Sequence, residues 1–232
     1  MALTNLALIQ SQLPLPLKIV RHKRAKRISL RVQPRGGHIV LTLPRYSSLK
    51  QAEDFIVSQH EWLVKQAAKV PTTTEFQNGE TIELLGEPVT ILHQPDARAG
   101  VRIESNNLCV SGESEFMQRR ISDFLVKYTK ARFSEMTRSL AQHTGKTVRR
   151  ISVRSMVSRW GSCSSRGDIS LNWRLVFAPV FVAEYVVAHE VAHLTHLDHS
   201  ADFWRLLHTL TPHTEAAKAW LNRYGNTLYR FG

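Results

Sequence analysis

Cysteine is almost absent from this chain of 232 residues, in which Cys109 and Cys163 are the only two. Two thiols cannot form the disulfide framework that stabilises many small secreted proteins, so we expect a reducing compartment, the cytoplasm. No apolar run approaches the length of roughly 18 residues that a membrane-spanning helix needs, so we expect no contact with a membrane. Internal repeats and low-complexity tracts are absent too, which argues against a repeat array or a disordered chain.

Acidic residues are missing from the first 50 positions, where ten lysines and arginines supply +10 of the formal net charge of +12. The densest part is residues 21–27, with the sequence RHKRAKR. Such a patch is typical of a surface that binds nucleic acid, here through Lys23, Arg24, Lys26 and Arg27. Because the segment contains no aromatic residue for base stacking, the solvated basic face of a strand is an alternative interpretation.

Hydrophobic periodicity predicts an α+β fold. We expect an extension without targeting function at residues 1–19, a β-rich part with one helix at 20–112, and a mixed, largely helical domain at 113–232. The last two parts could form one compact unit. The predicted strands are residues 28–32, 39–43, 80–85, 88–93, 100–104, 107–110, 151–156 and 168–176. The predicted helices span 48–68 and 114–145, begin at Pro179 and at Ser200, and end the fold at Gly225.

The strongest chemical signal is the sequence His189-Glu190-Val-Ala-His193 within an apolar helix. Residues i and i+4 lie one turn apart on the same helical face, so both imidazoles can reach one metal ion. Glu190 lies beside the pair, where it can accept a proton from a metal-bound water without ligating the metal. A chance occurrence of this pattern in a chain of this composition has a probability on the order of 3%. Two buried histidines and a buried glutamate also need partners, and one metal ion satisfies all three.

A catalytic zinc site requires a third protein ligand and one open position. His196 and His199 are the candidates. His196 lies about 10 Å from His189 along the helix axis, which is too far for two bonds near 2 Å to one ion. The sequence therefore favours His199, provided that the helix ends near Leu197 and Asp198 and a new helix begins at Ser200. One zinc ion per chain is expected.

At this point the chain resembles the YgjP-like zinc metallopeptidases, which are related to SprT-type proteases. The likeness runs from about residue 20 to 225 and is carried by three blocks, at residues 24–32, at 159–175 and at 189–204. The resemblance implies a zincin-like domain at 113–232 with His189, His193 and His199 as ligands. It also implies Glu190 as the base that activates water for attack on a peptide bond.

Further roles follow from the resemblance. A strand that includes Ile169, Ser170 and Leu171 would border the cleft and bind an extended substrate along its edge, although its pattern alone indicates a core strand. Arg159 is a candidate for stabilising the oxyanion, and a surface ion pair is an equally good explanation of it. Cys163 would make the zinc structural if it were a fourth ligand, whereas the resemblance favours an open position.

The expected partner is a protein or peptide substrate. The rival hypothesis is a nucleic-acid-binding module with a structural zinc, and a combined hypothesis is a protease that acts on proteins bound to nucleic acid. The sequence carries no indication of an oligomeric state.

Overall fold

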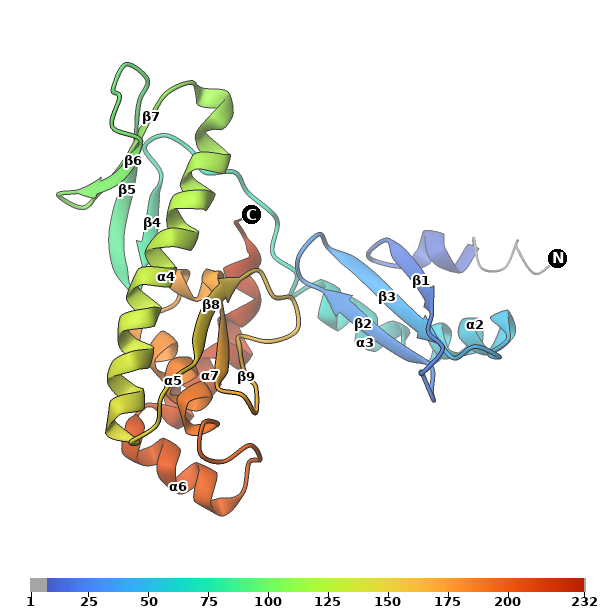
Figure 1. The fold of residues 1–232 in the computed structure, drawn as a ribbon. Coiled ribbons are helices and arrows are strands. Elements are labelled where there is room, and N and C mark those ends of the chain that lie inside the picture. The colour runs from blue at the N-terminus through green and yellow to red at the C-terminus, as the bar shows by residue number, and fades with distance from the viewer. Residues whose placement is uncertain (1–7, 232) are drawn as a thin grey trace. The chain divides into compact units, whose positions relative to one another are not determined.

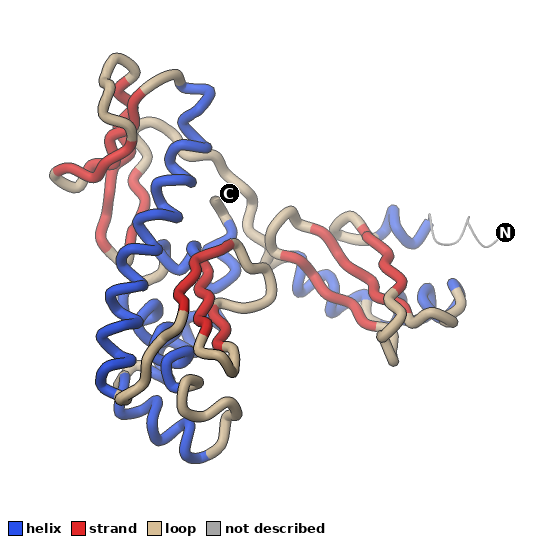
Figure 2. Tube along the Cα trace, in the orientation of Figure 1, coloured by secondary structure: helices blue, strands red, loops and turns tan. Residues whose placement is uncertain are grey.

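The computed structural model describes residues 8–231, and its two units meet between Thr73 and Thr74 (Figure 1). Each unit has its own cluster of buried apolar side chains. Both units combine helices with small sheets, as the tube in Figure 2 shows, which confirms the predicted α+β class. Residues 1–7 of the predicted extension lie outside the described residues.

The first unit contains a three-stranded sheet in the order β1-β3-β2. Its strands are β1 (Leu17–Arg21), β2 (Ser29–Gln33) and β3 (His38–Leu43). The predicted hairpin is confirmed as the antiparallel pair β2 and β3. β1 lies partly within the segment predicted as an extension and pairs in parallel with β3. Its five residues follow a proline-containing stretch, which left too short a pattern to identify a strand.

Two helices pack on this sheet where one was predicted over residues 48–68. They are α2 (Leu49–Ser58) and α3 (His60–Ala67), separated at Gln59, whose φ of −105° and ψ of 9° end α2. Ser48 caps α2 through a capping box with Gln51. Glutamine is a good helix former, so the break at Gln59 is not visible in the sequence pattern. The core of this unit comprises Ile39, Leu41, Leu43, Ala52, Ile56 and Leu63.

The second unit opens with a four-stranded sheet in the order β4-β5-β7-β6. The strands are β4 (Thr81–Leu84), β5 (Glu87–Gln94), β6 (Val101–Glu104) and β7 (Asn107–Ser111), which confirms the four strands predicted in this region. Ser105 and Asn106 both have positive φ in the turn between β6 and β7, as a two-residue hairpin turn requires.

The long helix α4 (Met117–His143) contacts β6, β7 and β8 and shares one hydrophobic core with all of the second unit. Ile121, Leu125 and Phe133 are the buried side chains on its inner face. Because this face covers the four-stranded sheet, the division of the chain lies at Thr73, whereas the sequence placed it near residue 112.

A second, three-stranded sheet has the order β8-β10-β9 and comprises β8 (Arg150–Arg154), β9 (Gly161–Cys163) and β10 (Asp168–Asn172). β9 lies within residues 158–167, the segment between the predicted strands 151–156 and 168–176 that the sequence pattern predicts as a loop. The strand predicted over 168–176 ends at Asn172, because the Asn172 side chain accepts a hydrogen bond from the Arg174 backbone N–H and starts a short 3-10 helix, η2 (Trp173–Phe177).

Three helices complete the second unit: α5 (Val180–Ala192), α6 (Ala201–Leu210) and α7 (Thr214–Tyr224). α5 is buried along most of its length and contacts α4, α6, α7 and β9, so it forms the centre of the unit. The chain then ends in η3 (Gly225–Tyr229). None of the helices in residues 8–231 combines the length and apolar character needed to cross a lipid bilayer.

Candidate metal centre

The apolar helix α5 positions the first two histidines. Pro179 precedes it, and its valines and alanines are buried against the surrounding elements. His189 and His193 lie one turn apart near its C-terminal end, with ring centroids 4.9 Å from each other. Packing of the apolar residues therefore fixes the face on which both imidazoles lie.

His199 returns to this face because α5 ends at Ala192. The backbone N–H groups of Thr195 and His196 both donate to the Ala192 carbonyl, and Ser200 caps α6 immediately afterwards. Asp198 stabilises the turn because its side chain accepts a hydrogen bond from the Ser200 N–H. The Nε2 atoms of His199 and His189 are consequently 3.2 Å apart.

The ring nitrogens of the three histidines lie close together. His189, His193 and His199 each offer a ring nitrogen, and these atoms all lie within 4.8 Å of one another. The His193 Nδ1–H donates to the His196 carbonyl at 2.8 Å, which leaves Nε2 of the neutral ring free for a metal. His196 thus takes part through its backbone, and its side chain is not in the group.

Aromatic side chains pack against the three imidazole rings. The Phe203 side chain is fully buried, and its ring centroid lies 5.0 Å from that of His189, 4.6 Å from that of His193 and 4.8 Å from that of His199. Trp204 lies beside His199 at 5.9 Å, and the Lys218 ammonium lies 5.2 Å from the Trp204 ring centroid. The apolar contacts hold the imidazoles in place and restrict their rotation.

The electrostatics of the group fit a metal site. Burial, together with the neighbouring charges of His193 and His199, lowers the pKa of His189 to about 4. Burial also lowers the pKa of His193. Neutral imidazoles are the form that binds a metal. Three ring nitrogens that lie this close to one another are therefore a donor set that suits a cation at their centre.

Glu190 lies beside the group without joining it. Its side chain is buried, with 5% of the residue exposed, and its Oε2 has no hydrogen-bond partner among the described residues. Burial raises the pKa of this carboxyl to about 7, while the positive charge of Arg159 acts in the opposite direction. A carboxyl with such a pKa can both accept and release a proton near neutrality.

Gly161 of β9 makes room for this carboxyl. A Cβ atom added at Gly161 would lie 2.6 Å from Glu190 Cγ, which is too close for any side chain. The backbone of β9 therefore packs directly on Glu190. We had not identified Gly161 from the sequence, although it lies within the Arg159–Cys163 block that carries the family resemblance.

A cavity of about 250 Å³, which we call the Glu190 cavity, opens next to the histidines. Trp160, Tyr185 and Leu221 give it apolar walls, and the exposed Arg159 lines it together with Glu190. The sequence analysis missed Tyr185, although it lies four residues before His189 and hence on the same helical face. Burial raises the pKa of its phenol, as do the charges of Glu215 and Glu190.

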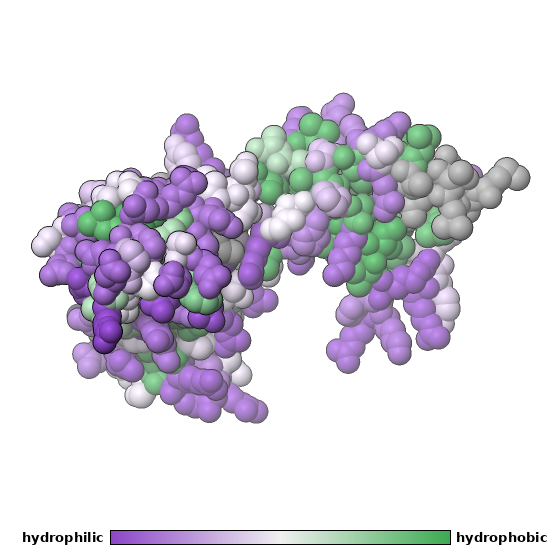
Figure 3. All heavy atoms as spheres, turned by 90° about the horizontal axis from the view of Figure 1, so that it is seen from above, coloured by the Kyte–Doolittle hydropathy of each residue, from purple (hydrophilic) through white to green (hydrophobic). Residues whose placement is uncertain are grey.

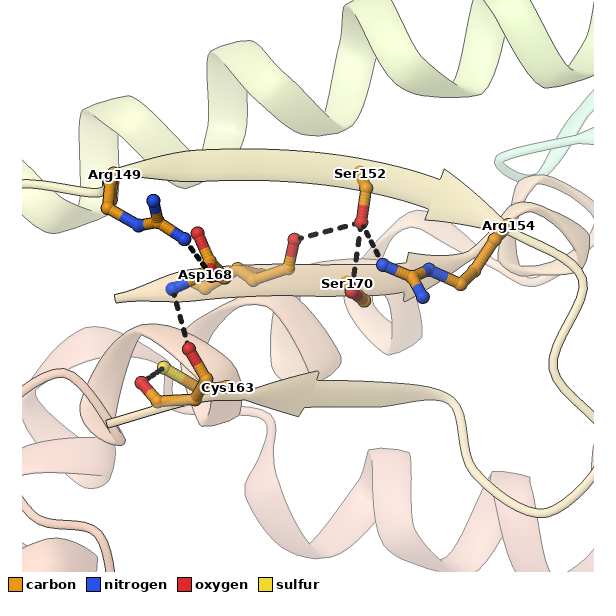
Figure 4. A network of polar contacts seen from close by, with 8 residues as sticks. Arg149, Ser152, Arg154, Cys163, Asp168 and Ser170 are labelled. Carbon is orange, nitrogen blue, oxygen red and sulfur yellow. Dashed lines mark hydrogen bonds and ion pairs between the residues drawn. The ribbon is translucent and has the colours of Figure 1, made fainter. Parts of the chain in front are cut away.

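The predicted substrate strand is wrong in its detail. Ile169, Ser170 and Leu171 are buried in β10, the central strand, whose two edges are paired with β8 and β9. Figure 4 shows Ser170 directed toward Ser152 of β8, with their hydroxyl oxygens 2.9 Å apart. The outer strands of this sheet are β8 and β9, and β9, which the sequence pattern did not reveal as a strand, is the one that packs on Glu190.

Cys163 is not part of the histidine group. Its thiol donates to the Ser164 carbonyl at 3.5 Å (Figure 4), and burial raises its pKa to about 11. The geometry therefore favours three protein ligands over the four-ligand alternative.

The basic segment lies in the first unit, in the loop between β1 and β2. Lys23, Arg24, Lys26 and Arg27 are all exposed, and none has an ion-pair partner among residues 8–231. They occupy a loop, whereas the alternative interpretation had them on a strand face. Long hydrophilic side chains project from the first unit in Figure 3.

An exposed aromatic residue lies near the end of β1, outside the basic segment, which itself contains none. The Arg21 guanidinium donates to the Arg45 and Ser47 carbonyls and so connects the end of β1 to residues 44–47. Tyr46 in that stretch is 87% exposed, and the Arg45 guanidinium lies 5.4 Å from its ring centroid. The contact joins segments that are far apart in sequence, which a linear pattern does not show.

Comparisons with known proteins extend these observations. A family model described as YgjP-like, metallopeptidase domain matches residues 26–224, a range that contains the three histidines and Glu190. Among solved structures, the metallopeptidase zymogen of Pyrococcus abyssi abylysin aligns with 43% of this chain and 97% of that chain, at 23% sequence identity and a TM-score of 0.36. A comparison with curated proteins finds no match.

The ligand assignment predicts different effects of two neighbouring substitutions. His199→Ala removes a ligating nitrogen and should weaken zinc binding at least about 100-fold. His196→Ala retains the backbone carbonyl that accepts from His193 and should change the affinity less than about threefold. Competition with a chromogenic chelator measures both constants. Equal losses in the two variants, or a larger loss for His196→Ala, would contradict the assignment.

The raised pKa of Glu190 predicts how the stability of the metal-free protein depends on pH. Below its ordinary value of 4.5 the carboxyl is protonated in both folded and unfolded chains, so it has no effect. Between 4.5 and about 7 only the unfolded chain releases the proton, and stability is lost as the pH rises. Glu190→Gln should therefore stabilise the chelator-treated protein at pH 8 by about 3 kcal/mol and leave it unchanged at pH 4. Urea unfolding measures the difference, and a pH-independent difference would refute it.

Proposed function

The chain belongs to the YgjP-like family of metallopeptidases, and from this premise we propose that it is a zinc-dependent endopeptidase with Glu190 as its general base. The observation that carries the proposal is the convergence of three histidine nitrogens within 4.8 Å beside a buried carboxyl that is not one of the ligands. A metal-dependent peptidase needs this division between groups that bind the metal and a group that moves protons.

The donor set favours zinc. Three imidazole nitrogens with no carboxylate or thiolate suit a zinc ion that keeps a fourth position for substrate or water. When bound, zinc polarises a substrate carbonyl and makes a water molecule a better nucleophile at neutral pH. The two cysteines, Cys109 and Cys163, are unpaired, which supports a reducing compartment such as the cytoplasm.

Glu190 would perform both proton transfers. Its carboxylate accepts the proton of the attacking water and then delivers it to the leaving amine. The pKa of about 7 suits both steps, because the group exchanges a proton readily at neutral pH. The close packing of Gly161 holds the carboxyl beside the histidines throughout. Arg159 lines the same cavity, and we assign to its guanidinium the stabilisation of the negative charge that develops on the substrate oxygen.

β9 supplies the binding edge for the substrate in this proposal. One side of β9 pairs with β10, and β9 is the outer strand of its sheet. An extended peptide can add to such an edge through backbone hydrogen bonds, which do not depend on the peptide's sequence. Gly161 would bring that peptide next to Glu190. A substrate that lies along an open strand edge needs no free terminus, which favours cleavage within a chain.

The proposal predicts a selective loss of hydrolysis in Glu190→Gln. The substitution preserves side-chain size and leaves the three histidines intact, so zinc content should match that of the wild type. Loss of the base should lower hydrolysis of an unfolded protein such as casein by about 100- to 10,000-fold. Activity is measured with and without chelator at matched zinc content. Equal chelator-sensitive activity in both proteins would exclude Glu190 as the base.

Nucleic-acid binding by the first unit is a second candidate function. It is supported by the cluster of four unpaired, exposed cations in the β1–β2 loop and by the adjoining exposed Tyr46. Cations contact phosphates without regard to sequence, and an exposed aromatic ring can stack on an unpaired base. Binding would bring nucleic acid to the first unit of the peptidase.

Neutralising this cluster tests the second function. Replacement of Lys23, Arg24, Lys26 and Arg27 by Gln should reduce the slope of log affinity against log salt for single-stranded DNA by roughly 3. Zinc content should not change. A matched variant that neutralises four exposed cations of α4, Lys127, Lys130, Arg132 and Arg138, should retain the wild-type slope. If the wild type retains no DNA at low salt, the cluster is only a solvated surface.

A further inference from the structure

A second cavity, of about 290 Å³, adjoins the metal centre at His193. We call it the Lys146 cavity. His193 lines it, whereas His189 lines the Glu190 cavity. The two cavities therefore meet the histidine group at different ligands.

Three segments that are distant in sequence form the Lys146 cavity. They are the residues after α4, the turn between β9 and β10, and the stretch after α5. Gly167 has a φ of +77°, in the left-handed region that favours glycine, and a Cβ there would be in ordinary van der Waals contact with the Thr147 carbonyl oxygen at 3.6 Å and Leu194 Cδ2 at 3.7 Å. Backbone hydrogen bonds from Gly167 to Ser164 and from Arg149 to Gly167 fix the turn.

The chemistry of the lining is cationic and hydroxylic. Lys146 and Arg166 line the cavity together with Thr147, Ser165 and Thr195, and no carboxylate is among the lining residues. Two acidic residues adjoin the lining along the chain. Asp168 is paired with Arg149 (Figure 4), and the charge of Arg166 also lowers its pKa; Asp198 accepts a hydrogen bond from the Ser200 N–H. Neither the Lys146 ammonium nor the Arg166 guanidinium has a hydrogen bond or ion pair within residues 8–231.

Unpaired cations that share a concave surface with several hydroxyl donors suit an anionic oxygen group. The Glu190 cavity differs, since it combines apolar walls with a buried carboxyl. We propose that the Lys146 cavity is a subsite that selects substrates carrying an anionic side chain, a carboxylate or a phosphoryl group, close to the scissile bond. This inference rests on the proposed peptidase function, because it names the class of substrate that the site takes.

β9 connects the two cavities. Gly161 at its start packs on Glu190, and the Ser164–Gly167 turn at its end lines the Lys146 cavity. Three residues of extended strand span about 10 Å. A peptide paired with the β9 edge therefore has its anionic side chain within about three residues of the bond beside Glu190. Two cations and several neutral donors would favour that side chain over its uncharged isostere by about 5- to 20-fold, since charge-assisted hydrogen bonds at a partly exposed site contribute roughly 1–2 kcal/mol.

The first arm of the test measures binding, which does not require hydrolysis. Fluorescein-labelled peptides with an alanine and glycine background carry Asp, Asn, Glu, Gln or phosphoserine at one position, and zinc-loaded Glu190→Gln protein serves as the receptor. The Asp, Glu or phosphoserine peptides should bind about 5- to 20-fold more tightly than the amide peptides. Comparison among the three anions identifies whether a carboxylate or a phosphoryl group is preferred.

Two double variants in the Glu190→Gln background show which residues cause the preference for anionic peptides. Lys146→Gln with Arg166→Gln should reduce the ratio of anionic to amide affinity to nearly one. Arg98→Gln with Lys127→Gln removes the same charge from exposed positions that line neither cavity, and it should keep the ratio. An unchanged ratio in the first variant, or no discrimination before substitution, overturns the inference.

The second arm measures kcat/KM for the same peptides with the wild type. The preferred anion should raise kcat/KM by a similar factor, and Lys146→Gln with Arg166→Gln, introduced into the wild type, should abolish the preference. If no peptide is cleaved although the binding ratio behaves as described, the anion subsite stands and the peptidase proposal fails. If peptides are cleaved without discrimination, the peptidase proposal stands and the anion subsite fails.

Discussion

The meeting of three imidazoles at the end of α5 is the constraint on which the rest of the site depends. Their ring nitrogens lie within 4.8 Å of one another, and burial lowers the pKa of His189 and His193. A cation bound at their centre would replace the 3.2 Å hydrogen bond between the Nε2 atoms of His199 and His189. The turn that ends α5, the Phe203 ring and the carbonyl that accepts from His193 all serve to hold this arrangement.

The metal centre also depends on the sheet that contains β9. Glu190 can remain buried next to the histidines only because Gly161 has no side chain, and Gly161 keeps its position because β9 pairs with β10. β10 is in turn the buried centre of its sheet. Glu190, the proposed general base, the candidate substrate edge and the two cavities that adjoin the histidine group thus rely on one short strand, and a distortion of β9 would disturb all of them together.

The sequence predicts local features better than features that long-range contacts create. His189, Glu190 and His193 follow from helical spacing, and His199 follows from geometry because a continued helix would place His196 out of reach. β9 escaped prediction because its three residues contain glycine and two small polar side chains, and only pairing with β10 makes them a strand. The pattern of Ile169–Leu171 correctly indicated a core strand, whereas the substrate edge was implied by the resemblance alone, and pairing on both sides buries the strand. Hydrogen bonds from Arg21 to the carbonyls on either side of Tyr46 place this residue near the end of β1, and the linear sequence pattern does not show such contacts.

The central claim is that the metal has three histidine ligands and one open position. Zinc K-edge X-ray absorption of the zinc-loaded wild type tests it most directly, because sulfur and nitrogen ligands give distinct distances, near 2.3 Å and 2.0–2.1 Å. The account predicts three imidazole nitrogens and one additional light scatterer from water, with no sulfur. A sulfur scatterer, which would place Cys163 on the metal, or a fourth imidazole would contradict the open catalytic site.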